Sequence, residues 1–164
     1  MKTIYLLFAF IILTSITISA QKNKSDSDST AVDQGIKNII ESREYEFNGT
    51  FAHPTSGGQI DLFSTPNYLI VNGDSASADL PFYGEAYVAG YGQENGIVFD
   101  NKIKEYKSED QAKKKQFKIS FQVSGKSDNF HIYLFISYNG YATLSINSNN
   151  KAPISYVGKV KGLK

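Results

Sequence analysis

The chain has 164 residues, enough for one domain of ordinary size, and its formal net charge is only +1. A charge this small provides no general attraction to nucleic acid or anionic lipid. The absence of cysteine excludes disulfides, thiol nucleophiles, thiolate metal sites and the lipid anchor of bacterial lipoproteins.

The first twenty residues predict a signal peptide. Lys2 provides a positive start, an apolar run extends from Ile4 to Ile18, and Ala20 offers a small residue at the cleavage site. The run is shorter than the roughly 20 apolar residues that a spanning helix needs, and the polar Gln21 follows at once. An uncleaved anchor is the alternative. Cleavage would remove Lys2 and leave a net charge of zero.

Residues 21–30 contain no apolar residue and are expected to form a flexible leader, so that the single domain covers 31–164. Isoleucines at 36, 39 and 40 then follow Val32 at helical spacing, and Thr30 can cap the segment. This spacing predicts one short helix over about 31–43, with its apolar side on the domain.

From residue 45 onward the apolar period becomes two, which is typical of strands with one buried face. Tyr45, Phe47 and Phe51 alternate with polar residues in the first of them. Asn72-Gly73 and Asn139-Gly140 are strong signals for hairpin turns. A third hairpin is expected around Asn101-Lys102, followed by a charged loop at 108–115. Further strands are expected at 59–63, 68–71, 75–80, 96–100, 103–107, 117–123, 130–137, 141–147 and 154–160.

The strand at 117–123 has the clearest pattern, because four apolar side chains alternate with polar ones along it. Regular short strands joined by local turns favour a mainly all-β fold, an antiparallel meander closed as a small barrel or folded as a sandwich. One short N-terminal helix completes the predicted domain.

Sequence blocks along nearly the whole chain after the leader point to one known family. They are Tyr45–Phe47, Leu80–Gly84, Ala86–Tyr87, Gly96–Asp100, Ser137–Leu144, Asn147–Asn149 and Ile154–Tyr156 with Gly158. Together they resemble the domain-of-unknown-function 4251 family of small exported Bacteroidetes proteins. The resemblance implies one β-rich domain in the periplasm or at the cell surface. It implies no activity and supplies no catalytic residue.

Side chains for common catalytic sites are scarce in this sequence. The two histidines are His53, expected in a loop, and His131, expected on a strand, and there is no G-x-S-x-G motif. Asp26 and Asp28 lack the glycine and closing glutamate of a calcium loop. The basic run at 113–115 is expected to be solvated. We therefore expect no enzymatic activity, no cofactor, no metal and no nucleic acid.

The segment from Phe82 to Asn95 has the densest aromatic content, interleaved with glycines. Tyrosine offers an apolar face and a polar tip for recognition, and glycine lets a loop approach a ligand. The candidate ligand-binding residues are Phe82, Tyr83, Glu85, Tyr87 and Tyr91. One alternative is that these aromatic residues plug an open end of the barrel, or cover the core where the sheet bends. Another, disfavoured, is a glycosidase in which Glu85 pairs with Glu94 or Asp100.

Together these features predict a non-enzymatic binding protein of the cell envelope, monomeric and with no membrane span after signal cleavage. Its partner would be a small molecule, a glycan or an envelope protein. A structural, protein-interaction role in the envelope is the alternative. Ser29 and Ser75 each follow an aspartate in triplets that resemble Bacteroidetes O-glycosylation acceptors, so modification at either is a hypothesis.

Overall fold

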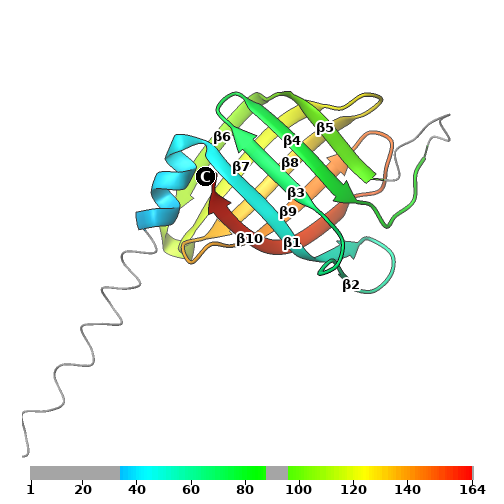
Figure 1. Ribbon diagram of the computed structural model, residues 1–164, viewed down its shortest axis with the longest axis horizontal. Coiled ribbons are helices and arrows are strands. Elements are labelled where there is room, and N and C mark those ends of the chain that lie inside the picture. The colour runs from blue at the N-terminus through cyan, green and yellow to red at the C-terminus, as the bar shows by residue number, and fades with distance from the viewer. Residues whose placement is uncertain (1–33, 88–95, 164) are drawn as a thin grey trace, which may run out of the picture.

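The computed structural model describes residues 34–87 and 96–163, which form one antiparallel sheet and one helix (Figure 1). The helix covers residues 34–42 of this range. The described strands are β1 (Glu44–Pro54), β2 (Ile60–Asp61), β3 (Tyr68–Asn72), β4 (Ser75–Pro81), β5 (Gly96–Lys102), β6 (Lys104–Gln111), β7 (Gln116–Ser124), β8 (Asn129–Ser137), β9 (Tyr141–Ser148) and β10 (Ile154–Gly162), with a short 3₁₀ turn, η1 (Ala112–Lys114), before β7.

The sheet curls into a nearly closed barrel. Its strand order is β5-β4-β3-β1-β10-β9-β8-β7-β6, and β2 pairs with β1 outside this path. The first and last strands of the chain, β1 and β10, lie side by side near the middle of the order. The all-β prediction with one N-terminal helix is therefore confirmed, and of the two architectures left open it is the barrel that forms.

The expected hairpin around Asn101-Lys102 is wrong, because β5 and β6 do not pair with each other. β5 pairs only with β4, and β6 pairs only with β7, although a single residue separates β5 from β6. Asn101 and Lys102 stay in β5, opposite Ala76 and Ser75 of β4, so they cannot form a turn. β5 and β6 are thus the two edges of the sheet. Asn101 bridges the seam, because its Nδ2 donates to the Ser124 carbonyl of β7 at 3.2 Å.

Alternation fills the interior of the barrel with apolar side chains. The inward positions of β7 and β8 are all buried, including the four apolar residues of β7 that the sequence places on one face. Tyr45, Phe47 and Tyr156 are fully buried. The hydroxyls of the two tyrosines have partners: Tyr156 Oη donates to the Pro81 carbonyl at 2.8 Å, and Tyr45 Oη lies 3.4 Å from Tyr106 Oη.

A β-bulge in β1 overturns the prediction that Phe51 shares a face with Tyr45 and Phe47. The register with β10 shifts between Gly49 and Phe51, so that Ala52 takes the next buried position. Phe51 consequently lies on the outer face and is only half-buried. A two-residue period cannot reveal such an inserted residue.

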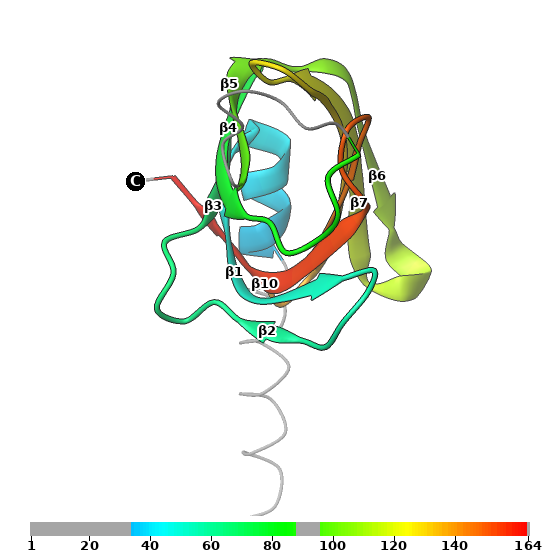
Figure 2. The same ribbon diagram turned by 90° about the vertical axis from the view of Figure 1, so that its right-hand side faces the viewer.

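Apolar side chains of the helix and of the segment after β4 pack against the core of the barrel. Ile36 and Ile40 of the helix join the core, and in Figure 2 the helix lies behind the ring of strands, across the far end. Phe82 and Tyr83, just after β4, pack half-buried against the same core. The predicted helix is confirmed over the described residues, whereas its proposed start at 31–33 lies outside them.

Three local predictions differ from the structure. The strand expected at 59–63 is reduced to Ile60–Asp61, because Leu62 begins a turn that Thr65 closes with a backbone hydrogen bond. The charged loop expected at 108–115 is strand as far as Gln111, since an exposed edge strand needs no apolar face. His53, expected in a loop, lies within β1 opposite Ser155.

Candidate functional site

The aromatic segment after β4 is only partly available as a surface. Phe82 and Tyr83 are half-buried against the core, whereas Glu85 is exposed and Tyr87 is 62% exposed. Its backbone is fixed to the β9–β10 loop, because the Tyr87 N–H donates to Asn150 O at 2.8 Å and the Ala152 N–H donates to Glu85 O at 2.9 Å. Tyr91 and Glu94 lie outside the described residues.

Of the five predicted site residues, two are half-buried, two are exposed and one lies outside the described residues. Phe82 and Tyr83 pack against the core, and Lys151 Nζ lies 5.4 Å from the centre of the Phe82 ring. Glu85 and Tyr87 project from the same segment into solvent. Asp100, the described carboxylate considered as a partner for Glu85, lies in β5 opposite Ser77.

Other sites considered from the sequence remain sparse. His53 and His131 are half-buried on β1 and β8. Among residues 34–87 and 96–163, no group of three or more histidine, aspartate or glutamate side chains could hold a metal ion. No helix in that part of the chain is long and apolar enough to cross a membrane. Ser75 begins β4 half-buried, with its Oγ donating to Asn72 O at 3.0 Å, and Ser29 lies outside the described residues.

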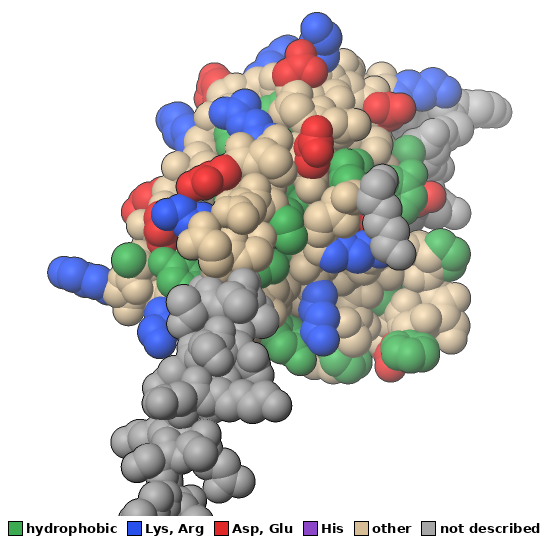
Figure 3. Space-filling view, turned by 60° about the vertical axis from the view of Figure 1, so that its left-hand side comes forward, with side chains coloured by type: hydrophobic (Ala, Val, Ile, Leu, Met, Phe, Trp, Pro, Cys, Tyr) green, Lys and Arg blue, Asp and Glu red, His purple; other side chains and the backbone are tan. Residues whose placement is uncertain are grey.

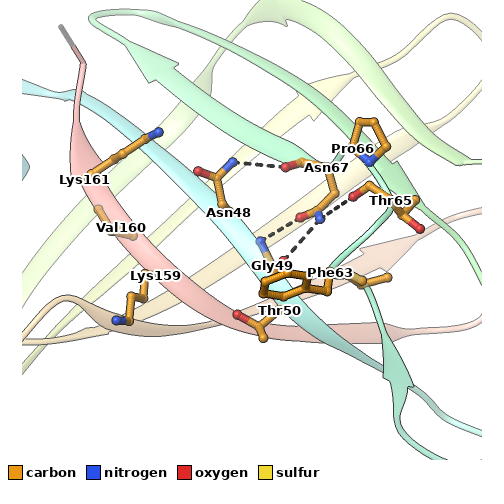
Figure 4. Close-up of a pocket in the computed structure, with 11 residues that line it drawn as sticks. Asn48, Gly49, Thr50, Phe63, Thr65, Pro66, Asn67, Lys159, Val160 and Lys161 are labelled. Atoms are coloured by element: carbon orange, nitrogen blue, oxygen red, sulfur yellow. Dashed lines mark hydrogen bonds between the residues drawn. The ribbon is translucent and has the colours of Figure 1, made fainter.

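A groove that the sequence analysis missed lies beside the β1 bulge (Figure 4). It has a volume of about 590 Å³ and is bounded by β1, β10 and the loop between β2 and β3. Gly49 of β1 lies opposite Gly158 of β10 at the bulge. A Cβ at Gly49 would lie only 2.8 Å from Asn67 Oδ1 and 3.2 Å from Leu62 Cδ1, so a side chain here would have to displace the Asn67 amide. The glycine signals a bulge or a close backbone approach, and could have drawn attention to this place.

Asn67 fixes the loop to the barrel. Its Oδ1 accepts the Gly49 N–H at 2.6 Å, and its Nδ2 donates to Gly49 O at 3.2 Å and to Thr65 O at 3.0 Å (Figure 4). Asn48 Nδ2 donates to the Asn67 carbonyl at 3.1 Å. Gly49 lies between the residues of β1 that pair with β3 and those that pair with β2. At this position the side chain of Asn67 replaces the backbone of a neighbouring strand as the hydrogen-bond partner.

The loop presents a large aromatic ring to solvent. Leu62 is buried and anchors the turn, while the next residue, Phe63, is 89% exposed. The Phe63 N–H donates to Asp61 Oδ1 at 2.6 Å, and the Leu62 N–H donates to Thr50 O at 2.9 Å. Phe63 was expected at the end of a strand, where nothing in the pattern indicated such exposure.

Lysines of β10 line the opposite side of the groove. Lys161 Nζ forms an ion pair with Glu46 at 3.2 Å, whereas Lys159 Nζ lies 4.6 Å from the centre of the Tyr141 ring. Elsewhere the charges are mixed: Figure 3, which brings the helix-covered end forward, shows basic and acidic side chains interspersed among the described residues. A mixture of this kind produces no extended single-sign field on that face.

The comparisons with known proteins agree with this fold. The family model described as a domain of unknown function, DUF4251, matches residues 28–160. The chain belongs to the DUF4251 family. A crystal structure of a DUF4251 family protein from Bacteroides eggerthii DSM 20697 is similar, with a TM-score of 0.62, 18% sequence identity, and coverage of 80% of this chain and 88% of that one. No curated protein matches. At this identity the similarity to the Bacteroides protein establishes the fold of the DUF4251 domain alone.

Proposed function

We propose that this protein is a non-enzymatic binding protein of the cell envelope, and that its ligand occupies the groove beside the β1 bulge. The observation that carries the proposal is the presentation of Phe63, a large apolar side chain held in solvent by a well-anchored turn. Covering such a ring contributes roughly 1.5–3 kcal/mol. Because the turn is already ordered by hydrogen bonds, little conformational entropy remains to be lost on binding.

The chemistry of the groove supports binding more than catalysis. Its lining residues are amides, hydroxyls, lysines and apolar groups, and Asn67 is occupied in holding the loop. The residues are Asn48, Gly49, Thr50, Leu62, Phe63, Thr65, Pro66, Asn67, Lys159, Val160 and Lys161. A hydrolytic mechanism would need a positioned base or nucleophile with a partner. A pocket with an aromatic anchor and a few polar groups is the usual form of a ligand site.

Saturation-transfer NMR against soluble oligosaccharides, fatty acids and short peptides tests this proposal. We expect at least one class to bind, and Phe63→Ala to weaken that binding roughly tenfold or more. The ring is exposed, so the substitution should change stability by less than about 0.5 kcal/mol. Tyr87→Ala is the control, because it removes an exposed aromatic ring that does not line the groove. Binding that depends on Tyr87 but not on Phe63, or no binding by any class, would contradict the proposal.

The envelope location rests on the N-terminal pattern, a positive start followed by an apolar run and a small residue at position 20. Cell fractionation with intact mass measurement tests it separately. A product that begins at Gln21 in the periplasmic or surface fraction is expected. Full-length protein in the cytosol would contradict export and leave the groove proposal standing.

A further inference from the structure

A second, smaller hollow lies beside the groove on the outer face of the sheet. It measures about 130 Å³ and is lined by residues of β7, β8, β9 and β10, among them Phe135, Tyr141, Thr143 and Val157. Lys159 lines the first hollow and Tyr141 the second, and the ammonium of Lys159 lies 4.6 Å from the Tyr141 ring centre. The two hollows therefore share a wall made by this pair.

The strand register aligns these side chains in two outer rows across the sheet. Asn48 lies opposite Lys159, and Lys159 lies opposite Tyr141. In the next row Phe51 and Val157 are paired, followed by Thr143 and Phe135. Strands are spaced about 4.8 Å apart, so a track from β1 to β8 covers about 15 Å. A ligand that follows this track must be an extended chain.

We infer that the two hollows form one continuous track for an acidic oligosaccharide, an inference that rests on the proposed function of the groove. Exposed aromatic and apolar faces occur along the track at Phe63 (89% exposed), Tyr141 (53%) and Val157 (36%). The hydroxyls of Thr50 and Thr143 lie among them, within the linings of the two hollows. A sugar ring has apolar faces and a hydroxylated rim, and this alternation complements it.

The charge along the track indicates the acidic character of the ligand. Lys161 is already paired with Glu46, but the described ion pairs include no carboxylate partner for Lys159, which lies over Tyr141 instead. Lys159 stands at the wall that a bound chain must cross. A carboxylate on the chain would give this ammonium an ionised hydrogen-bond partner, which is a stronger contact than a neutral one.

The position of the track disfavours an extended peptide. Peptides that add to a sheet bind through the unpaired backbone groups of an edge strand. β10, β9 and β8 each have a hydrogen-bonded strand on both sides, and β1 pairs with β10 on one side and with β3 and β2 on the other. The free edges belong to β5, β6 and the two-residue β2. Recognition on this face therefore depends on side chains, as it does for a sugar.

Calorimetric titration with galacturonate oligomers of one, three and six residues tests the inference, with the methyl-esterified hexamer as an uncharged match. We expect affinity to rise from monomer to hexamer and to fall roughly tenfold or more on esterification. Lys159→Gln and Tyr141→Ala should each weaken hexamer binding by a similar factor. Lys102→Gln, which removes an exposed lysine of β5, is the matched control and should bind as the unchanged protein does.

The outcomes separate this inference from the proposed function. Failure of the acidic hexamer to bind, equal affinity for the esterified hexamer, or full binding by Tyr141→Ala would each overturn the track. A ligand from another class that still depends on Phe63 would leave the groove proposal intact. Loss of the Phe63 dependence for every ligand would overturn both.

Discussion

Gly158 shows at the scale of one residue how closely β1 and β10 approach at the bulge. A Cβ at this position would overlap the carbonyl oxygen of Asn48. The obstacle is backbone, which cannot rotate aside, so Gly158→Ala must separate the two strands. We expect a loss of about 2 kcal/mol or more in the free energy of unfolding, measured by urea denaturation.

Gly58 provides the matched control for that substitution. Nothing lies within 4 Å of a Cβ built there, and its backbone does not require a positive φ. Gly58→Ala should therefore be neutral or stabilise by up to about 1 kcal/mol through the unfolded state. Equal effects of the two alanines would mean that the strands are not held at this separation.

Buried tyrosines couple the stability of the barrel to alkaline pH. Burial raises the pKa of Tyr156, and the neighbouring Tyr83 raises it further. Burial likewise raises the pKa of Tyr45. In the unfolded chain tyrosine has a pKa of about 10, so above that pH the unfolded state releases a proton that the folded state keeps. The stabilisation is complete below pH ~10 and declines above it, by up to about 1.4 kcal/mol per pH unit for each such tyrosine.

Tyr156→Phe tests this coupling. At pH 7 it removes the hydrogen bond to Pro81 O and should cost about 0.5–1.5 kcal/mol. This difference in stability should shrink between pH 9 and pH 11. Over that range the unchanged protein loses the stabilisation linked to Tyr156, whereas the variant has no such group to lose. Urea denaturation across this range measures it, with Tyr87→Phe at an exposed ring as the control. A deficit that stays constant up to pH 11 would contradict the assigned coupling.

At the scale of elements, the β2–β3 loop depends on Asn67. Asn67→Ala removes the partner of the Gly49 N–H and both bonds donated by Nδ2, so we expect a loss of about 1–3 kcal/mol. Hydrogen exchange at the Gly49 amide should accelerate. Asn67→Asp keeps the acceptor for that amide and should protect it better than alanine. Equal Gly49 exchange in both variants would show that the Oδ1 contact does not hold the loop.

Individual strands were predictable where one face is buried and the ladder is regular. β7 alternates from Phe117 to Val123, and the prediction located it to within one residue at each end. β6 was partly missed, because its outer-edge position leaves it without buried residues and without an apolar signal. The groove was missed for a different reason: the Asn67 bridge joins residues 18 positions apart, and the bulge arises where β1 pairs with β10, the last described strand of the chain.

The candidate site shows the same limit. Aromatic density drew attention to Phe82 and Tyr83, yet these rings also suit the covering of a barrel end, and composition alone cannot separate the two uses. Phe63 belongs to no aromatic cluster in the sequence. Its ring is exposed because the chain turns directly after the buried Leu62. Exposure of a single ring depends on tertiary structure, so the sequence could not indicate it.

At the scale of the whole molecule, β5 and β6 do not pair with each other, so we expect stability to differ from strand to strand around the barrel. β6 has one hydrogen-bonded neighbour and no buried residue, whereas β1 and β10 lie inside the sheet. β5, the opposite edge, is held by buried Ile97 and Phe99, and the Phe99 ring centre lies 5.4 Å from that of Phe130. Local opening should therefore begin at β6, because this strand has no buried residue and only its partly buried Tyr106 packs against the core.

Native-state hydrogen exchange measures this order directly. Amides of β6 bonded to β7 should exchange with an opening free energy well below the global value, while those between β1 and β10 should require global unfolding. Phe99→Ala should bring β5 toward the behaviour of β6, since it removes the aromatic contact between β5 and Phe130 of β8. Exchange of β6 only through global unfolding would mean that the seam is closed in solution by contacts as strong as those within the sheet.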